Sequence, residues 1–308
     1  MVWKRPNRHL IGEAEASVSI AEVYTEIKSL LRVPQVPLLF QIYAGNGDFL
    51  ARLWQALKPV LHTRAFAGSA ERLSADAYTR MHNYFEIGNL RPVADGSVPQ
   101  DLARMLEIFQ HQNSSLLLLL SFAAEAFDNP VGQPSTSAEQ TTAEDFSFSP
   151  AVPETEMSAQ TVRILEEARR QSGVGAAPPE LRALAAWPDF LGHYWQNWKR
   201  ITESPLLSAC ENQLLQHSIE LAHRLPGPVE LSFATLGDSG LKEEDFSGMV
   251  RLTQHWHRAL VRQLLQVSGA KIAFEGGSGR ARTQPEAEKP EAKKKDAVKP
   301  SETPTRAA

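Results

Sequence analysis

The chain has 308 residues, of which 42% are hydrophobic and 22% charged, and its formal net charge is −4. These values are typical of a globular protein with one large or two modest domains. The single cysteine, Cys210, excludes an intramolecular disulfide framework, a paired-cysteine redox site and a multi-cysteine zinc site. The longest apolar run, residues 116–124, is too short to cross a bilayer, and the first residues lack the apolar core of a secretory signal. We therefore expect a cytoplasmic protein that has no membrane partner.

The C-terminal end of the chain differs in composition from the rest. From residue 275 onward it carries eight basic and six acidic residues and contains no Ile, Leu, Phe, Tyr, Trp or Met. Such a segment cannot form a core, so we expect a disordered tail at 274–308. Without it, 24 basic and 30 acidic residues remain. This acidic balance argues against a nucleic-acid partner.

An internal duplication organises the chain. Residues 23–60 align without a gap to residues 164–201, which lie 141 positions further on, and ten of the 38 positions are identical. The shared D-F-L-x-x-x-W pattern indicates two copies of one module rather than a many-repeat solenoid. The identical pairs are Glu26/Glu167, Val33/Val174, Pro37/Pro178, Ala44/Ala185, Asp48/Asp189, Phe49/Phe190, Leu50/Leu191, Trp54/Trp195, Gln55/Gln196 and Lys58/Lys199.

Three segments have the apolar spacing of amphipathic helices, at residues 102–120, 207–225 and 249–264. The second ends at a Pro-Gly-Pro sequence, which is a helix stop signal. An offset of 144 aligns the first segment with the third and places Asn113 opposite His257. Because alternation with a period of two is almost absent, we predict an all-α fold.

We expect a first helical repeat at 15–127, a linker at 128–156 and a second helical repeat at 157–273. The linker is rich in Pro, Ser, Thr and Gln and is long enough to let the two tandem repeats pack face to face as an intramolecular pseudo-dimer. A cleft at their interface is a natural ligand site. We expect Trp54 and Trp195 to belong to the core rather than to contact a ligand.

Two carboxylates in the stretch PPELRALAAWPDFL are candidates for chemistry. Asp189 has a counterpart in the first copy, Asp48, so it serves what both copies need, and a helix cap that favours the dipole is the natural role. Glu180 has Leu39 as its counterpart, so its charge is present in one copy alone. This favours a site role for Glu180, although a solvated carboxylate at a helix start has the same pattern.

Polar residues on the long helices are also unequal between the copies. Asn113 stands where the other copy has His257, as expected of one small-molecule site built across a pseudo-dyad. The structural alternatives are a buried amide with its hydrogen bonds satisfied and a partly buried histidine. His255 and His257 are not a metal pair, because positions two apart on a helix point to different sides. Cys210 lies on an apolar stripe and is expected to fill the core.

Three stretches, LRVPQVPLLFQIYA, FQHQNSSLLLLL and ALAAWP, resemble the group I 2-haloacid dehalogenases, the DehI-type or DL-2-haloacid family. The resemblance covers nearly all of residues 15–272. It implies an all-helical pseudo-dimer around a buried site that hydrolyses short 2-haloalkanoic acids of either configuration. In this family a carboxylate activates a water, which attacks C2 directly, inverts the configuration and expels halide without a covalent intermediate. No metal and no organic cofactor are implied.

The resemblance also assigns roles to residues of this chain. Glu180 falls where the family has its catalytic aspartate, and Asn113 falls on the asparagine that holds the water. His257 is a candidate to bind the substrate carboxylate or the halide. The positions implied to bind the substrate are Gln35, Leu38, Pro179, Thr253, Trp256, His257 and Leu260.

Two functions therefore stand as hypotheses. The first is a hydrolytic dehalogenase that acts on a small-molecule carboxylate. The second is a non-catalytic or divergent helical module that binds a small carboxylate or a protein partner. In either case the sequence leaves open whether the chain forms a homodimer.

Overall fold

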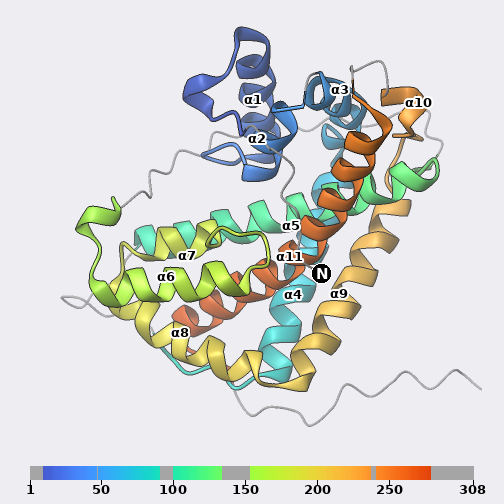
Figure 1. Cartoon of the computed structure of the whole chain (residues 1–308). Coiled ribbons are helices and arrows are strands. Elements are labelled where there is room, and N and C mark those ends of the chain that lie inside the picture. The colour runs from blue at the N-terminus through green and yellow to red at the C-terminus, as the bar shows by residue number, and fades with distance from the viewer. Residues whose placement is uncertain (1–9, 47, 91–99, 134–152, 237–240, 279–308) are drawn as a thin grey trace, which may run out of the picture.

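The computed structural model of the chain describes residues 10–46, 48–90, 100–133, 153–236 and 241–278. Every regular element in these ranges is a helix, so the prediction of an all-α fold is confirmed. Isolated β-bridges join Val131 to Val229 and Gln133 to Pro226. The elements, seen in Figure 1, are η1 (Glu13–Glu15), α1 (Val18–Leu31), α2 (Leu38–Ala44), α3 (Phe49–Leu61), α4 (Arg64–Tyr84), α5 (Gln100–Asp128), η2 (Glu154–Glu156), α6 (Ala159–Gln171), α7 (Pro179–Leu184), α8 (Pro188–Thr202), α9 (Pro205–His223), α10 (Phe233–Leu236) and α11 (Glu243–Glu275).

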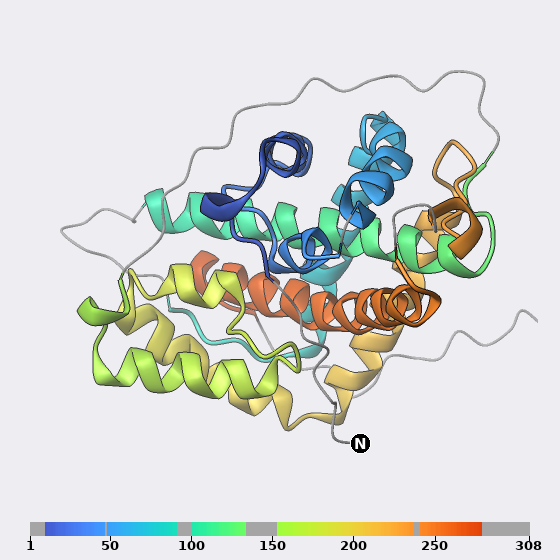
Figure 2. The ribbon, with the colours of Figure 1, turned by 45° about the horizontal axis from the view of Figure 1, so that its top comes forward.

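The two longest helices, α5 and α11, pack against each other at the centre of the molecule (Figures 1 and 2). They run antiparallel, because Gln110 of α5 donates a hydrogen bond to Ser268 while Phe127 packs edge-on against Phe246. The run of leucines at 116–120 makes α5 apolar on all sides, and such a helix is stable only when it is surrounded by protein. Helices α4 and α9 also pack against this central pair.

The helices of the two halves follow one another in the same order. At the offset of 141, α1 to α4 correspond to α6 to α9, and α5 corresponds to α11 at the offset of 144. The caps correspond as well. Ser17 and Ser158 cap α1 and α6, while Thr63 and Ser204 cap α4 and α9, each through a side-chain oxygen that accepts a backbone N–H.

One side-chain hydrogen bond occurs in both halves. The indole N–H of Trp54 donates to Glu26, and that of Trp195 donates to Glu167, each over 2.8 Å. A buried indole needs an acceptor for its N–H, which explains why both residues of each pair are identical in the sequence alignment. Trp54 and Trp195 are 2% and 1% exposed, so their predicted place in the core is confirmed.

The buried apolar residues of both halves form one continuous cluster. Cys210 belongs to it, and burial raises the pKa of its thiol to about 11, in agreement with a core role. Phe274, the first residue assigned to the tail, lies in α11 and is buried. Residues 279–308 and most of the linker lie outside the described residues. No helix in the described part is long and apolar enough to span a membrane.

The aligned aspartates do not cap their helices as predicted. Asp48 precedes α3 and Asp189 lies in the first turn of α8, but neither side chain makes a capping hydrogen bond. Both are exposed. The charge of Asp189 still lies near the positive end of the dipole of α8, where it is favourable.

Candidate active site

Glu180 is a buried carboxylate on the short helix α7. Two prolines open this helix: Pro178 precedes it and Pro179 is its first residue. Glu180 follows in the first turn and is 1% exposed, whereas Asp189 is exposed. Neither carboxylate oxygen of Glu180 has a hydrogen-bond partner among the described residues. A buried carboxylate that lacks such partners is costly, and this is a common feature of sites where chemistry occurs.

Burial changes the protonation of this carboxylate. Loss of solvation raises the pKa of Glu180 to about 8, while its own backbone N–H and the nearby Asn113 amide act in the opposite direction. The Asn113 side chain is thus a neighbour of the carboxylate, although the geometry is not that of a formed hydrogen bond. Near pH 7 a large share of Glu180 is neutral, and it becomes a base as the pH rises through 8.

Asn113 and Gln112 contribute further buried polar atoms without partners. Asn113 is fully buried on α5, and neither its amide nitrogen nor its oxygen has a partner; the same holds for the Oε1 atom of Gln112. Among the described residues the one other buried side-chain atom in this condition is Nε of Arg80, which lies 2.8 Å from Asp76. Polar groups without partners are rare in protein interiors, so their concentration around Glu180 requires an explanation.

A cavity of about 380 Å³ lies beside these groups. Segments from both halves line it: residues 34–41 with the start of α2, helix α5, Met157, residues 174–183 with α7, and helix α11. Asn113 lies in its wall, as do Pro179 and Ala183, which flank Glu180 on α7. Most of the remaining wall is apolar. Such a cavity, mainly apolar with a few polar groups at one place, is typical of a small-molecule site.

The structure brings most of the predicted site residues to this cavity; Glu180 is not itself a wall residue but lies between the wall residues Pro179 and Arg182 on α7. The predicted residues in the cavity wall are Gln35, Leu38, Asn113, Pro179, Trp256 and Leu260. Thr253 and His257 are not in the wall. Thr253 is fully buried, and its hydroxyl lies 2.8 Å from the carbonyl of Met249 and 2.5 Å from the hydroxyl of Tyr43. It therefore joins α11 to α2.

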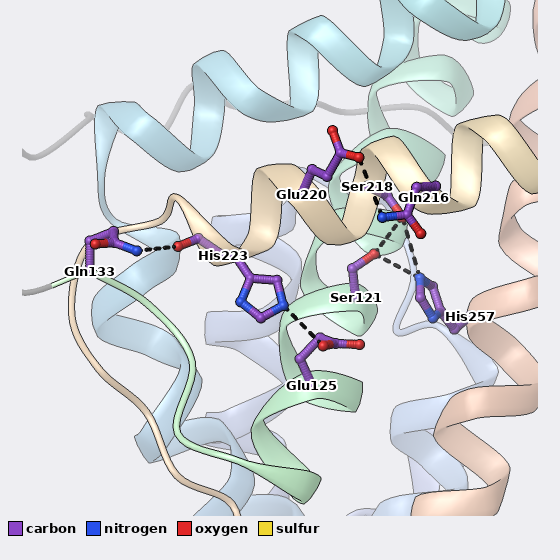
Figure 3. Close-up of polar contacts among 8 residues, drawn as sticks. All are labelled: Ser121, Glu125, Gln133, Gln216, Ser218, Glu220, His223 and His257. Carbon is purple, nitrogen blue, oxygen red and sulfur yellow. Dashed lines mark hydrogen bonds and ion pairs between the residues drawn. The ribbon is translucent and has the colours of Figure 1, made fainter. Parts of the chain in front are cut away.

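His257 has a comparable structural position. Its Nε2 atom lies 2.7 Å from Ser121 Oγ and 3.4 Å from Ser218 Oγ, so the ring joins α11 to α5 and α9 (Figure 3). Burial, and secondarily the charge of Arg258, lowers the pKa of His257 to about 4. The lowered pKa leaves the imidazole neutral near pH 7, its Nε2 is engaged, and the ring is not in the cavity wall.

Sequence analysis missed four polar residues of the wall, namely Gln41, Gln112, Arg182 and Gln263. Arg182 is the one cation among the wall residues, and its guanidinium makes no hydrogen bond or ion pair with the rest of the described chain. Gln263 lies three residues after Leu260, so helical spacing from a predicted wall residue could have found it. The part of the chain that the structure describes holds no cluster of His, Cys, Asp and Glu suited to a metal ion.

Comparison with known proteins agrees with this geometry. The family model described as "Halocarboxylic acid dehydrogenase DehI" matches residues 34–181, the range that contains Asn113 and Glu180. An (R)-2-haloacid dehalogenase from Rhizobium sp. (strain NHG3) is 21% identical over 229 residues, or 72% of this chain and 89% of that protein. The (R)-2-haloacid dehalogenase of Pseudomonas putida is 19% identical over 274 residues, or 85% and 91%. The chain thus resembles the DehI-type 2-haloacid dehalogenases over most of its length.

Solved structures have the same fold as this chain. A D-2-haloacid dehalogenase mutant in complex with D-2-CPA gives a TM-score of 0.77 at 17% identity, over 86% of this chain and 95% of that one. A D-2-haloacid dehalogenase with L-LA gives the same TM-score and identity and is covered to 96%. The helical arrangement described above is therefore that of a 2-haloacid dehalogenase.

The raised pKa of Glu180 makes a prediction about stability. Because the folded state holds this proton up to pH 8, whereas the unfolded chain releases it near the ordinary value of 4.5, stability is lost as the pH rises from 4.5 to 8. Glu180→Gln removes this loss. We expect the variant to be more stable than the wild type at pH 9, by on the order of a few kcal/mol, and to match it at pH 5.

Urea unfolding at both pH values measures this difference. Asp189→Asn is the control, because that carboxylate is exposed and should give the same small change at both pH values. A Glu180→Gln variant that is less stable than the wild type at pH 9 would show that burial of the ionised Glu180 carboxylate does not destabilise the folded protein.

Proposed function

We propose that the protein is a hydrolytic dehalogenase of short 2-haloalkanoic acids. In this proposal the Glu180 carboxylate activates a water, which attacks C2 and expels the halide without a covalent intermediate. The observation that carries it is the set of buried polar atoms without partners on Gln112, Asn113 and Glu180, beside a mainly apolar cavity. The dehalogenases to which the chain is related favour this reaction over others that a buried carboxylate could perform.

The reaction is balanced as a displacement. One water proton passes to Glu180 as the water oxygen forms a bond to C2, and the C2–halogen bond breaks with its electron pair leaving on the halide. The product is the 2-hydroxy acid of inverted configuration, and the proton on Glu180 then returns to solvent. The raised pKa of Glu180 supports this role, because a base with a pKa near the working pH removes a proton more effectively than an ordinary carboxylate.

Asn113 is proposed to hold the water. Its amide offers an NH2 group that can donate and a carbonyl oxygen that can accept next to Glu180, and neither atom is used by another described group. A water bound by both side chains would be oriented toward the cavity, and orientation of a reactant is a large part of catalysis. Glutamate is one methylene longer than the aspartate of the family, and the buried position of Glu180 on α7 is compatible with a slightly different water position.

Arg182 is proposed to receive the substrate carboxylate. It is the cation of the wall, and it lies on α7 two residues after the base. A guanidinium binds a carboxylate through paired hydrogen bonds and so fixes the direction of the substrate as well as its position. Gln112 and Gln263 add amide groups that can bind the halide or the second carboxylate oxygen.

We further propose that the halves, residues 15–127 and 157–273, are tandem repeats that pack as an intramolecular pseudo-dimer. The corresponding helices, caps and Trp–Glu hydrogen bonds support this. Both repeats contribute to the cavity, so one chain supplies the whole wall. Activity should then not depend on a second chain, whether or not a homodimer forms.

The decisive variants are Glu180→Gln and Asp189→Asn. We expect the purified protein to release halide from 2-chloropropionate and from monochloroacetate, Glu180→Gln to lose at least a thousandfold in kcat, and Asp189→Asn to stay within about threefold of the wild type. Both enantiomers should be tested, since the names of the relatives specify the (R) or D form.

No halide release from any of these acids, by a protein with a normal helical circular dichroism spectrum, would favour the binding module instead. In that case 2-haloacids should stabilise the protein without turnover. Loss of activity in Asp189→Asn but not in Glu180→Gln would reverse the assignment of the base.

The pH dependence gives a separate prediction. Because Glu180 must be ionised to act as a base, kcat/KM should rise with pH and level off above an apparent pKa of about 8. Initial rates of halide release between pH 5.5 and 9.5 measure this. A plateau that already begins near pH 5 would mean that the base has an ordinary carboxylate pKa.

Arg182→Gln tests the binding of the substrate carboxylate. Loss of a charge-assisted hydrogen bond should raise KM by roughly tenfold to a hundredfold, with a smaller change in kcat. Arg169→Gln on α6 is the matched control, because Arg169 is exposed, pairs with Glu166 and does not line the cavity. Equal KM values for the two variants would exclude Arg182 from substrate binding.

A further inference from the structure

We infer that the site takes 2-haloalkanoic acids whose apolar tail is several carbons longer than that of a 2-halopropionate. This inference rests on the proposed hydrolytic dehalogenation and extends its substrates beyond the short acids that the family resemblance implies. The evidence is the size of the cavity and the way in which polar and apolar residues are distributed along it.

The cavity is larger than a short haloacid requires. Its volume is about 380 Å³. A protein cavity of about 150 Å³ holds benzene, which has as many non-hydrogen atoms as 2-chloropropionate. The site therefore has room for a substrate about twice that size, and a short acid would leave much of the apolar wall without contact.

Along α5 the wall is apolar from Asn113 toward Leu120, whereas in the other direction it holds Gln112 and, one turn earlier, Phe109. The wall residues of α5 from Asn113 onward are Leu116 and Leu120, which lie successively further along the same helix face. With a rise of about 1.5 Å per residue, Leu120 lies roughly 10 Å beyond Asn113 along the helix axis. Gln112, the other polar wall residue of α5, adjoins Asn113 at the opposite end of this span.

Helix α11 has the same gradient in the opposite chain direction. Because it is antiparallel to α5, its residue Gln263 lies toward the Asn113 end, whereas Leu260 and Trp256 lie toward Leu120. The two central helices therefore place amides together at one end of the cavity and apolar side chains together at the other.

The short helices α7 and α2 complete the two ends. Helix α7 brings Glu180 next to Asn113. Helix α2 is bound to α11 through Tyr43 and Thr253, one turn from Trp256, and its residue Leu38 is in the wall. A substrate with its C2 atom at Glu180 and Asn113 would thus extend its tail between α5 and α11 toward α2.

The experiment measures halide release from racemic 2-chloro acids of increasing length, from propionate through butanoate and hexanoate to octanoate. Each methylene that enters the apolar end should raise kcat/KM by about fourfold, until the cavity is filled. Values of kcat/KM that are flat or fall from propionate onward would overturn the inference and leave the proposed dehalogenase intact.

A binding measurement separates this inference from the proposed function. Calorimetric titration of the wild type with propionate, hexanoate and octanoate, which carry no halogen, should give affinities that increase with length. If affinity increases but none of the chloro acids is turned over, the dehalogenase proposal fails and tail binding stands. Affinities independent of length would overturn the inference directly.

The variant Leu38→Trp tests the location of the tail. Leu38 is half-buried, so a larger side chain can be placed there with a smaller cost than in the tightly packed core. We expect the ratio of kcat/KM for 2-chlorooctanoate over 2-chloropropionate to fall at least tenfold. Leu215→Trp, at a half-buried position of α9 away from the cavity, should leave this ratio unchanged. An unchanged ratio in Leu38→Trp as well would overturn the proposed path.

Discussion

The arrangement of the site depends on the burial of one carboxylate, Glu180, in a position where no described group hydrogen-bonds to it. Removing a charge from water costs free energy, which the raised pKa of Glu180 expresses. The rest of the fold must hold that side chain in place. Helix α7 has only a few residues, but Leu181 and Leu184 anchor it in the common core, and Pro178 sets its start. Packing of the common core thus offsets the free-energy cost of burying the Glu180 carboxylate.

The buried residues of both halves form one core, so contacts in both halves offset the cost of burying Glu180. The Trp–Glu hydrogen bond occurs once in each half, at Trp54 and at Trp195, and fixes corresponding helices in the same way. The features that the two halves have in common thus stabilise the fold. The groups that could perform chemistry are those in which they differ, since a rigid scaffold can carry a substitution at one position without a change at its counterpart.

Periodicity and duplication allowed α5, α9 and α11, the all-α class and the special position of Glu180 to be predicted from the sequence. Helix α4, which is the counterpart of α9, was missed although Thr63 before it is a typical cap. The family resemblance placed Thr253 and His257 in the cavity, together with Trp256 and Leu260 on the same helix. A cavity touches only part of a helix face, and these two side chains turn toward α2 and toward α9. Neighbouring helices that are distant in sequence determine which side chains of this α11 face line the cavity. Helical periodicity carries no information about those helices.

The candidate site has no counterpart related by the duplication among the described residues. A second site related by the duplication would need a carboxylate at Leu39 and an amide at His257. Leu39 instead adds apolar surface to the cavity, and His257 is held by Ser121 and Ser218 as a neutral link between three helices. Asn113 occupies the corresponding position, and its amide has no hydrogen-bond partner among the described residues. Of the two corresponding residues, His257 stabilises the helical core and Asn113 remains available for a ligand. A ligand can thus contact amides and apolar side chains within a single cavity.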